Sequence, residues 1–291
     1  EFKRVGIILT FLTGFIVIAL QVFWFRAFRV YFTNTSYTFS IIASLVIGGL
    51  FIGSFLYRKY NSLITRPVKT GFYIMVFLSL VSFLGMIFIL NMPQWIMAPI
   101  QESFPSHHTR LFLIPFLSGL IIILPITTIS GFAFPFAIDL YTSSYKSISV
   151  SFGRIMFYNS LGAVLGPVMA AFVFIPIIGV AKGVIILSIL GLFAAIFFSY
   201  HKSIKEKRKT LIVFVLILIG IMGVRLLSKD GNKIMPASFT VQNRNVLFYN
   251  ETIDGTVVVG EEQRAGSKVK STYVNNASVI GSSYDAIKAV K

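Results

Sequence analysis

The sequence predicts an α-helical integral membrane protein with about seven transmembrane helices and a small C-terminal antiparallel β unit. Hydrophobic residues make up 56% of the 291 residues and charged residues only 12%, whereas an average soluble domain is about 25% charged. The apolar residues also gather in runs of about 20, the length that an α-helix needs to cross a bilayer. After Ser228 these runs stop, and Val, Thr, Tyr, Asn and Gly become common.

Seven apolar runs qualify as spans, and basic or proline-containing segments separate them. The second run stops at Arg58-Lys59, and the seventh follows the basic stretch 202–209. The fourth carries three prolines, which remove backbone donors, so it is either one kinked span or a span plus an interfacial half-helix. The segment from Pro93 to Thr109 is predicted to be a polar loop. The expected spans lie near residues 5–28, 37–57, 71–92, 111–140, 155–178, 183–200 and 211–227.

The chain divides into a helical domain, 1–228, and a β-rich soluble domain, 229–291. Three strands are expected in the second domain because β-branched and alternating residues recur there. A hairpin turn is expected at Arg264-Ala-Gly-Ser267. The last residues, from Tyr284, look like the start of a helix, so we expect the natural chain to continue. The expected strands are Ala237–Tyr249, Gly255–Glu261 and Lys268–Asn275.

Basic residues at the span ends predict the orientation. With seven spans, thirteen Lys and Arg lie on the side of the N-terminus and seven on the other side. The positive-inside rule therefore places the N-terminus in the cytoplasm and the β tail outside. If the 111–140 run crosses twice, the tail lies inside instead. The net charge of +16 is explained by these short basic loops, so we expect a lipid bilayer rather than nucleic acid as partner.

Polar side chains in or near the spans are the candidate binding residues, because such groups are costly in a membrane. Gln21 could bond a ligand or a neighbouring helix. Arg26 lies near a span end, where snorkelling to the interface is expected. Asp139 could bind a cation or form an interfacial salt bridge with Arg154. Asn159 opens the fifth span.

Two pairs of glycines, Gly49 with Gly53 and Gly162 with Gly166, have the GxxxG spacing that lets helices approach closely. Other chemistry is weakly represented. There are no cysteines, and the adjacent His107 and His108 have no acidic or thiol neighbours, so no metal site is predicted. We find no phosphate loop, no nucleophile elbow and no catalytic constellation. The chain alone is therefore expected to be non-catalytic.

Two stretches in the helical domain resemble a family of bacterial membrane proteins fused to a spermidine-synthase-like domain. The first is Gln21-Val-Phe-Trp-Phe-Arg26, where the family typically has Glu-x-x-Trp-x-Arg and Gln21 replaces the Glu. The second is Phe157-Tyr-Asn-Ser-Leu-Gly-Ala-Val-Leu-Gly166, which continues to Phe174-Ile-Pro-Ile-Ile-Gly179.

Three stretches of the tail are similar to the family's N-terminal β-domain and the segment that leads into its catalytic domain. They are Asp254-Gly-Thr-Val-Val-Val259, Tyr273-Val-Asn-Asn276 and Gly281-Ser-Ser-Tyr-Asp285. The resemblance adds Tyr284 and Asp285 to the candidate substrate-binding residues. It implies a bacterial inner-membrane location and an aminopropyltransferase domain after Lys291, whose cofactor would be decarboxylated S-adenosylmethionine. No cofactor is expected in this chain.

Three functions stay open from the sequence. The chain could be the membrane anchor of a spermidine-synthase-like enzyme. It could instead be a non-enzymatic subunit that scaffolds a larger complex, as a homo-oligomer or with other membrane subunits. The third alternative is a transporter of polyamines or other small solutes, although cation transporters usually place acids at mid-membrane.

Overall fold

The computed structural model describes residues 2–32, 36–104, 106–142, 148–199, 233–236, 239, 245–264 and 267–281. Within these ranges six helical segments are long and apolar enough to cross a membrane. The expected seventh span, 211–227, and the candidate residues Tyr284 and Asp285 lie outside the described residues.

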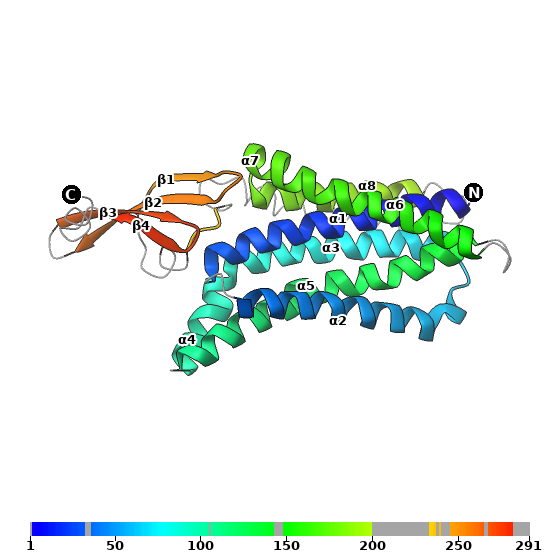
Figure 1. Ribbon diagram of the computed structural model, residues 1–291, viewed down its shortest axis with the longest axis horizontal. Helices are drawn as coiled ribbons and strands as arrows, with labels where there is room; N and C mark the ends of the chain where they lie inside the picture. The colour runs from blue at the N-terminus through cyan, green and yellow to red at the C-terminus, as the bar shows by residue number, and fades with distance from the viewer. Residues whose placement is uncertain are drawn as a thin grey trace.

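The helices form an elongated bundle (Figure 1). Two of the six long segments include a π-helical turn, η2 in the third and η4 in the fifth. In chain order the elements are α1 (Phe2–Tyr31), α2 (Ser36–Tyr60), η1 (Asn61–Leu63), α3 (Pro67–Met92), η2 (Pro93–Met97), α4 (Ala98–Ser103), α5 (His107–Tyr141), α6 (Ile148–Met169), η4 (Ala170–Phe174), α7 (Ile175–Ile178) and α8 (Val180–Ser199).

The loop expected from Pro93 to Thr109 is wrong for most of its length. The third helix continues through the π turn η2 and α4, so that Pro67–Ser103 is one helical segment of 37 residues. Pro93 opens the π turn, where a changed hydrogen-bond pattern accommodates a residue that has no N–H to donate. The fourth run forms one continuous helix, α5, with Pro115, Pro125 and Pro135 inside it, rather than a span plus a separate half-helix.

Close helix pairs hold the bundle together: α1 packs on α6, α2 on α5, and α3 on α8. Glycines make two of these contacts close. A β-carbon on Gly53 would overlap the backbone of α5 at Thr128, and one on Gly162 would overlap the backbone of α1 at Phe11. Around α1 lies the larger apolar core, in which Phe23 and Trp24 are almost fully buried.

The tail forms a four-stranded antiparallel sheet in the order β1-β2-β3-β4. Its strands are β1 (Asn245–Glu251), β2 (Thr256–Arg264), β3 (Ser267–Val274) and β4 (Ala277–Gly281). The hairpin expected between β2 and β3 is present, because Arg264 pairs with Ser267. The sequence prediction missed β4, and β1 starts eight residues later than the expected strand. Phe239 covers one face of the sheet at Gly260, against the ring of Tyr273.

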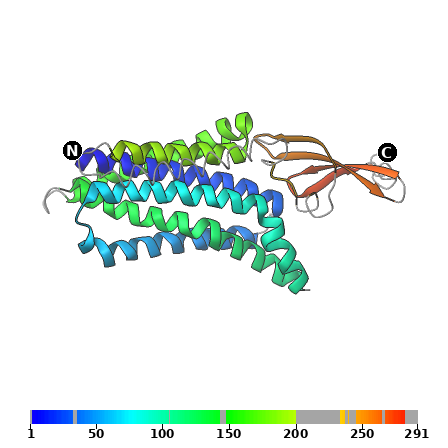
Figure 2. The same ribbon diagram turned by 180° about the vertical axis from the view of Figure 1, so that it is seen from behind.

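The sheet lies at the end of the bundle opposite the N-terminus, as both views show (Figures 1 and 2). At this end α1 finishes and α8 begins. The loop between β1 and β2 and the turn between β3 and β4 both contact α1, through hydrogen bonds to Arg26 and to the Tyr31 carbonyl. The last turns of α1 therefore hold the sheet at two points.

Candidate functional site

A network of buried polar side chains lies at the junction where the sheet meets the bundle. Arg26, on the last turns of α1, is only 6% exposed. Its Nη1 donates to the carbonyl of Ile253 at 3.2 Å and its Nη2 to the carbonyl of Thr252. The planar guanidinium suits this double contact, because its donors have a fixed fork geometry. Arg26 thus holds the β1–β2 loop, rather than reaching out to an interface as expected.

Glu251 is the second buried charged residue of the junction, at the last position of β1. Its Oε2 accepts the backbone N–H of Val180, the first residue of α8, at 2.6 Å. The first N–H groups of a helix have no intrahelical partner and carry a partial positive charge. A carboxylate from the sheet therefore caps a helix of the bundle.

Gly179 makes this cap possible. Its φ is +83° and its ψ is 169°, a backbone conformation that is essentially restricted to glycine and costs other residues about 1–3 kcal/mol. A β-carbon here would also stand 3.1 Å from Oε2 of Glu251. The short helix α7 ends at this glycine and α8 begins directly after it, so the chain turns sharply and exposes the Val180 N–H to the sheet.

Tyr249 completes the polar chain two residues before Glu251. The Tyr249 hydroxyl donates to Oε1 of Glu251 and accepts the N–H of Ile234 at 3.1 Å. Burial and the neighbouring Glu251 carboxylate raise the pKa of Tyr249 well above its usual value, so the phenol stays a donor. Burial also raises the pKa of Glu251, and the hydrogen bonds from Tyr249 and Val180 with the Arg26 charge limit that rise.

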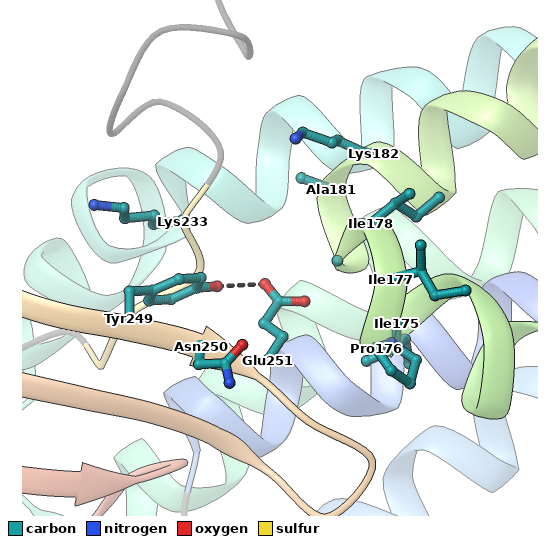
Figure 3. Close-up of a pocket in the computed structure, with 11 residues that line it drawn as sticks. Ile175, Pro176, Ile177, Ile178, Ala181, Lys182, Lys233, Tyr249, Asn250 and Glu251 are labelled. Atoms are coloured by element: carbon teal, nitrogen blue, oxygen red, sulfur yellow. Dashed lines mark hydrogen bonds between the residues drawn. The ribbon is translucent and has the colours of Figure 1, made fainter.

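A small cavity of about 280 Å³ opens beside this network, between the end of α7, the start of α8 and β1. Figure 3 shows Tyr249 and Glu251 pointing from the strand toward the helices, with Lys182 and Lys233 at the edges. The Lys233 ammonium lies 5.9 Å from the Tyr249 ring centroid. The arrangement joins the sheet to the bundle. Within the described residues no group of three or more His, Cys, Asp or Glu could hold a metal.

The other predicted site residues lie apart from the junction. Gln21 is half-buried in α1. Asn159 belongs to the α1–α6 contact, where its carbonyl oxygen lies 2.6 Å from the position of a β-carbon on Gly14. Asp139 lies near the opposite end of the bundle and accepts a hydrogen bond from Tyr57. Arg154 donates to Tyr141 at 2.7 Å, so Asp139 and Arg154 pair with tyrosines rather than with one another.

Sequence reasoning found Arg26 but missed Glu251, Tyr249 and Gly179 as parts of one site. Two signals were available. Glu251 is an acid that closely follows the aromatic pair Phe248-Tyr249 of a predicted strand, and Gly179 separates two apolar helical runs. Neither signal shows that the two residues meet, because 71 residues separate Val180 from Glu251.

Known proteins add no assignment. Comparison with models of protein families, with curated proteins and with solved structures finds no match.

Proposed function

We propose that the chain is a membrane-anchoring module that holds its β unit in a fixed orientation at the extracytoplasmic face of a membrane. The buried junction carries this proposal: Arg26 binds the β1–β2 loop, and Glu251 caps α8. A flexible tether needs no such contacts. Burying charged groups is costly unless they are hydrogen-bonded, so a network of this kind supports a fixed placement of the sheet.

The placement of the described residues supports seven spans and the proposed orientation. Ser199 ends α8 at the end of the bundle that holds the N-terminus, whereas Ile234 contacts Tyr249 at the sheet. The chain therefore enters residues 200–232 at one end of the bundle and leaves them at the other. We therefore propose one further crossing near 211–227, and the excess of basic residues at the N-terminal end favours a cytoplasmic location for that end.

Single cysteines test the orientation, because the chain has none of its own. Ser278, on β4, and Ser62, in η1, are both exposed and lie at opposite ends. In intact cells a membrane-impermeant maleimide is expected to label Ser278→Cys and to spare Ser62→Cys until the cells are lysed. Labelling of Ser62→Cys alone in intact cells would reverse the proposed orientation.

We further propose that the module belongs to a spermidine-synthase-like protein. The support is that three stretches of the resemblance meet at the junction. The first supplies Arg26, the second ends at Gly179, and the third begins at Asp254, within the β1–β2 loop that Arg26 binds. In that proposal the sheet is the entry module of an aminopropyltransferase domain, and decarboxylated S-adenosylmethionine is the donor of that domain.

The assay for this second proposal is methylthioadenosine release from decarboxylated S-adenosylmethionine by the natural protein purified from its membranes. Turnover with putrescine or another polyamine supports it. If no polyamine acceptor gives release, the proposal of an aminopropyltransferase is rejected. The anchoring proposal is tested independently, by variants of the junction residues.

A non-enzymatic scaffold is the second candidate, and the open face of the sheet favours it. Phe248 is 52% exposed, and Val274 lies on the same face at 36%. Apolar groups gathered on an exposed face are typical of protein contacts. Copurification of a stoichiometric partner from native membranes, lost on Phe248→Ser, would support the scaffold; recovery of a lone monomer would count against it.

A further inference from the structure

An apolar groove runs along the side of the bundle at the opposite end from the junction. Helices α2 and α3 both pack on α5 rather than chiefly on one another. They therefore form two walls, and α5 is the floor. The groove has a volume of about 530 Å³. Its walls carry Leu56 of α2 and residues 70–81 of α3, and its floor carries residues 124–132 of α5.

The lining excludes a polar ligand along most of the groove. Ile74, Phe77 and Val81 lie along one wall, and apolar residues including Ile129 form the floor. Thr70, Tyr73 and Thr128 are the polar residues among those that line it. From Thr70 to Val81 the α3 wall is about 17 Å long at a helical rise of 1.5 Å per residue. This is a shape for an extended hydrocarbon chain.

Basic residues stand at the end of α2 and the start of α3, the two helices that wall the groove. Lys69 precedes the wall residue Thr70, and its ammonium lies 5.9 Å from the ring centroid of Tyr73, which lines the groove. Arg58 and Lys59 lie in the last turn of α2, and Arg66 precedes α3; all three are exposed. The nearby acid Asp139 is hydrogen-bonded to Tyr57, and four cations against one anion leave this rim positive.

We propose that this groove binds an anionic phospholipid, with one acyl chain between α2 and α3 and the headgroup against the basic rim. The inference rests on the proposed membrane insertion. That insertion is tested separately by whether the protein can be extracted from membranes without detergent. Lys and Arg clusters at the end of membrane helices attract anionic lipids. Each buried methylene group of the chain contributes about 0.8 kcal/mol, so the apolar part supplies affinity and the rim supplies selectivity.

Native mass spectrometry of the detergent-purified protein tests the site, with phosphatidylglycerol and phosphatidylcholine of identical acyl chains as probes. The intact protein is expected to retain one phosphatidylglycerol in preference to phosphatidylcholine. Thr128→Phe fills the floor and displaces about two methylenes, so retention of both lipids should fall about tenfold. The double variant Arg66→Gln, Lys69→Gln should keep one bound lipid and lose the preference.

Two control variants match these changes. Val164→Phe enlarges an exposed residue of α6 outside the groove, and Arg4→Gln removes an exposed cation at the same end of the bundle. Both should leave retention unchanged. Equal retention of the two lipids by the intact protein overturns the proposal, as does retention that Thr128→Phe leaves intact. A protein dimer that excludes lipid and dissociates in Thr128→Phe would assign the groove to a second copy and also overturn it.

Discussion

At the scale of single residues, the junction depends on two charged side chains that lie out of solvent, Arg26 and Glu251. Each is compensated by backbone groups of the other domain: carbonyls for Arg26 and an N–H for Glu251. Hydrogen bonds to charged groups contribute about 1.5–3 kcal/mol each. If the sheet separates from the bundle, both charged side chains and their backbone partners lose these hydrogen bonds at the same time.

Glu251 gives the junction a pH dependence with a defined sign. Burial raises its pKa above the ordinary value of 4.5, so the docked sheet binds more protons than the undocked sheet in the window above pH 4.5. Docking is therefore strongest below pH 4.5 and weakens as pH rises through the raised value. Protection of the β1 amides from hydrogen exchange, corrected for the intrinsic rate, should fall across this window.

The matched variant is Glu251→Gln, whose amide does not titrate and can still accept the Val180 N–H. Its β1 protection should be flat with pH where that of the unaltered protein slopes. Protection that rises with pH in the unaltered protein contradicts the assigned sign.

Gly179 should tolerate no side chain. Gly179→Ala forces alanine into a backbone conformation that is essentially restricted to glycine, at about 1–3 kcal/mol, and brings its β-carbon against Glu251. Hydrogen exchange at Val180 and along β1 should accelerate roughly tenfold. Gly153→Ala is the control, because a β-carbon there meets nothing within 4 Å. Equal acceleration of exchange in the two variants would contradict the requirement for glycine at position 179.

At the scale of elements, the sequence predicts most of the helices and part of how they pack. Hydropathy locates the apolar cores of α1, α2, α3, α5, α6 and α8. It ends the third helix at Met92 and misses α4, since nothing in the pattern shows that Pro93 opens a π turn. The spacing of Gly49 and Gly53 indicates a close contact, and the structure supplies its partner, α5. The glycines that receive the contacts, such as Gly14 and Gly131, have no repeated spacing that could have identified them.

Two glycines on the same helix separate packing from helix propensity. A β-carbon on Gly53 would overlap the α5 backbone, whereas one on Gly48 meets nothing within 4 Å. Gly53→Val should therefore destabilise the bundle by about 1–3 kcal/mol and lower its Tm in detergent. Gly48→Val should change the Tm little, and a similar loss in both variants would contradict the proposed α2–α5 contact.

At the scale of the whole molecule, the sequence predicts two domains but not how they meet. Strand periodicity identifies β2 and β3 and the turn between them. It misses β4, because that strand is short and follows a tight turn in which Asn275 has a positive φ. The junction could not be predicted, because it joins α1, α8 and β1 through contacts more than 70 residues apart. Local patterns carry no information at that range.

The central claim is that the sheet is held rigidly on the bundle, and a distance between two spin labels tests it most directly. Ser103→Cys at the end of α4 and Ser278→Cys on β4 are exposed positions in a chain that has no other cysteine. Pulsed electron paramagnetic resonance should give one narrow distance distribution in the labelled protein. Adding Arg26→Ala should broaden it, and adding Arg29→Ala, an exposed neighbour on α1, should not. A broad distribution in the protein with Arg26 intact would contradict the anchored junction.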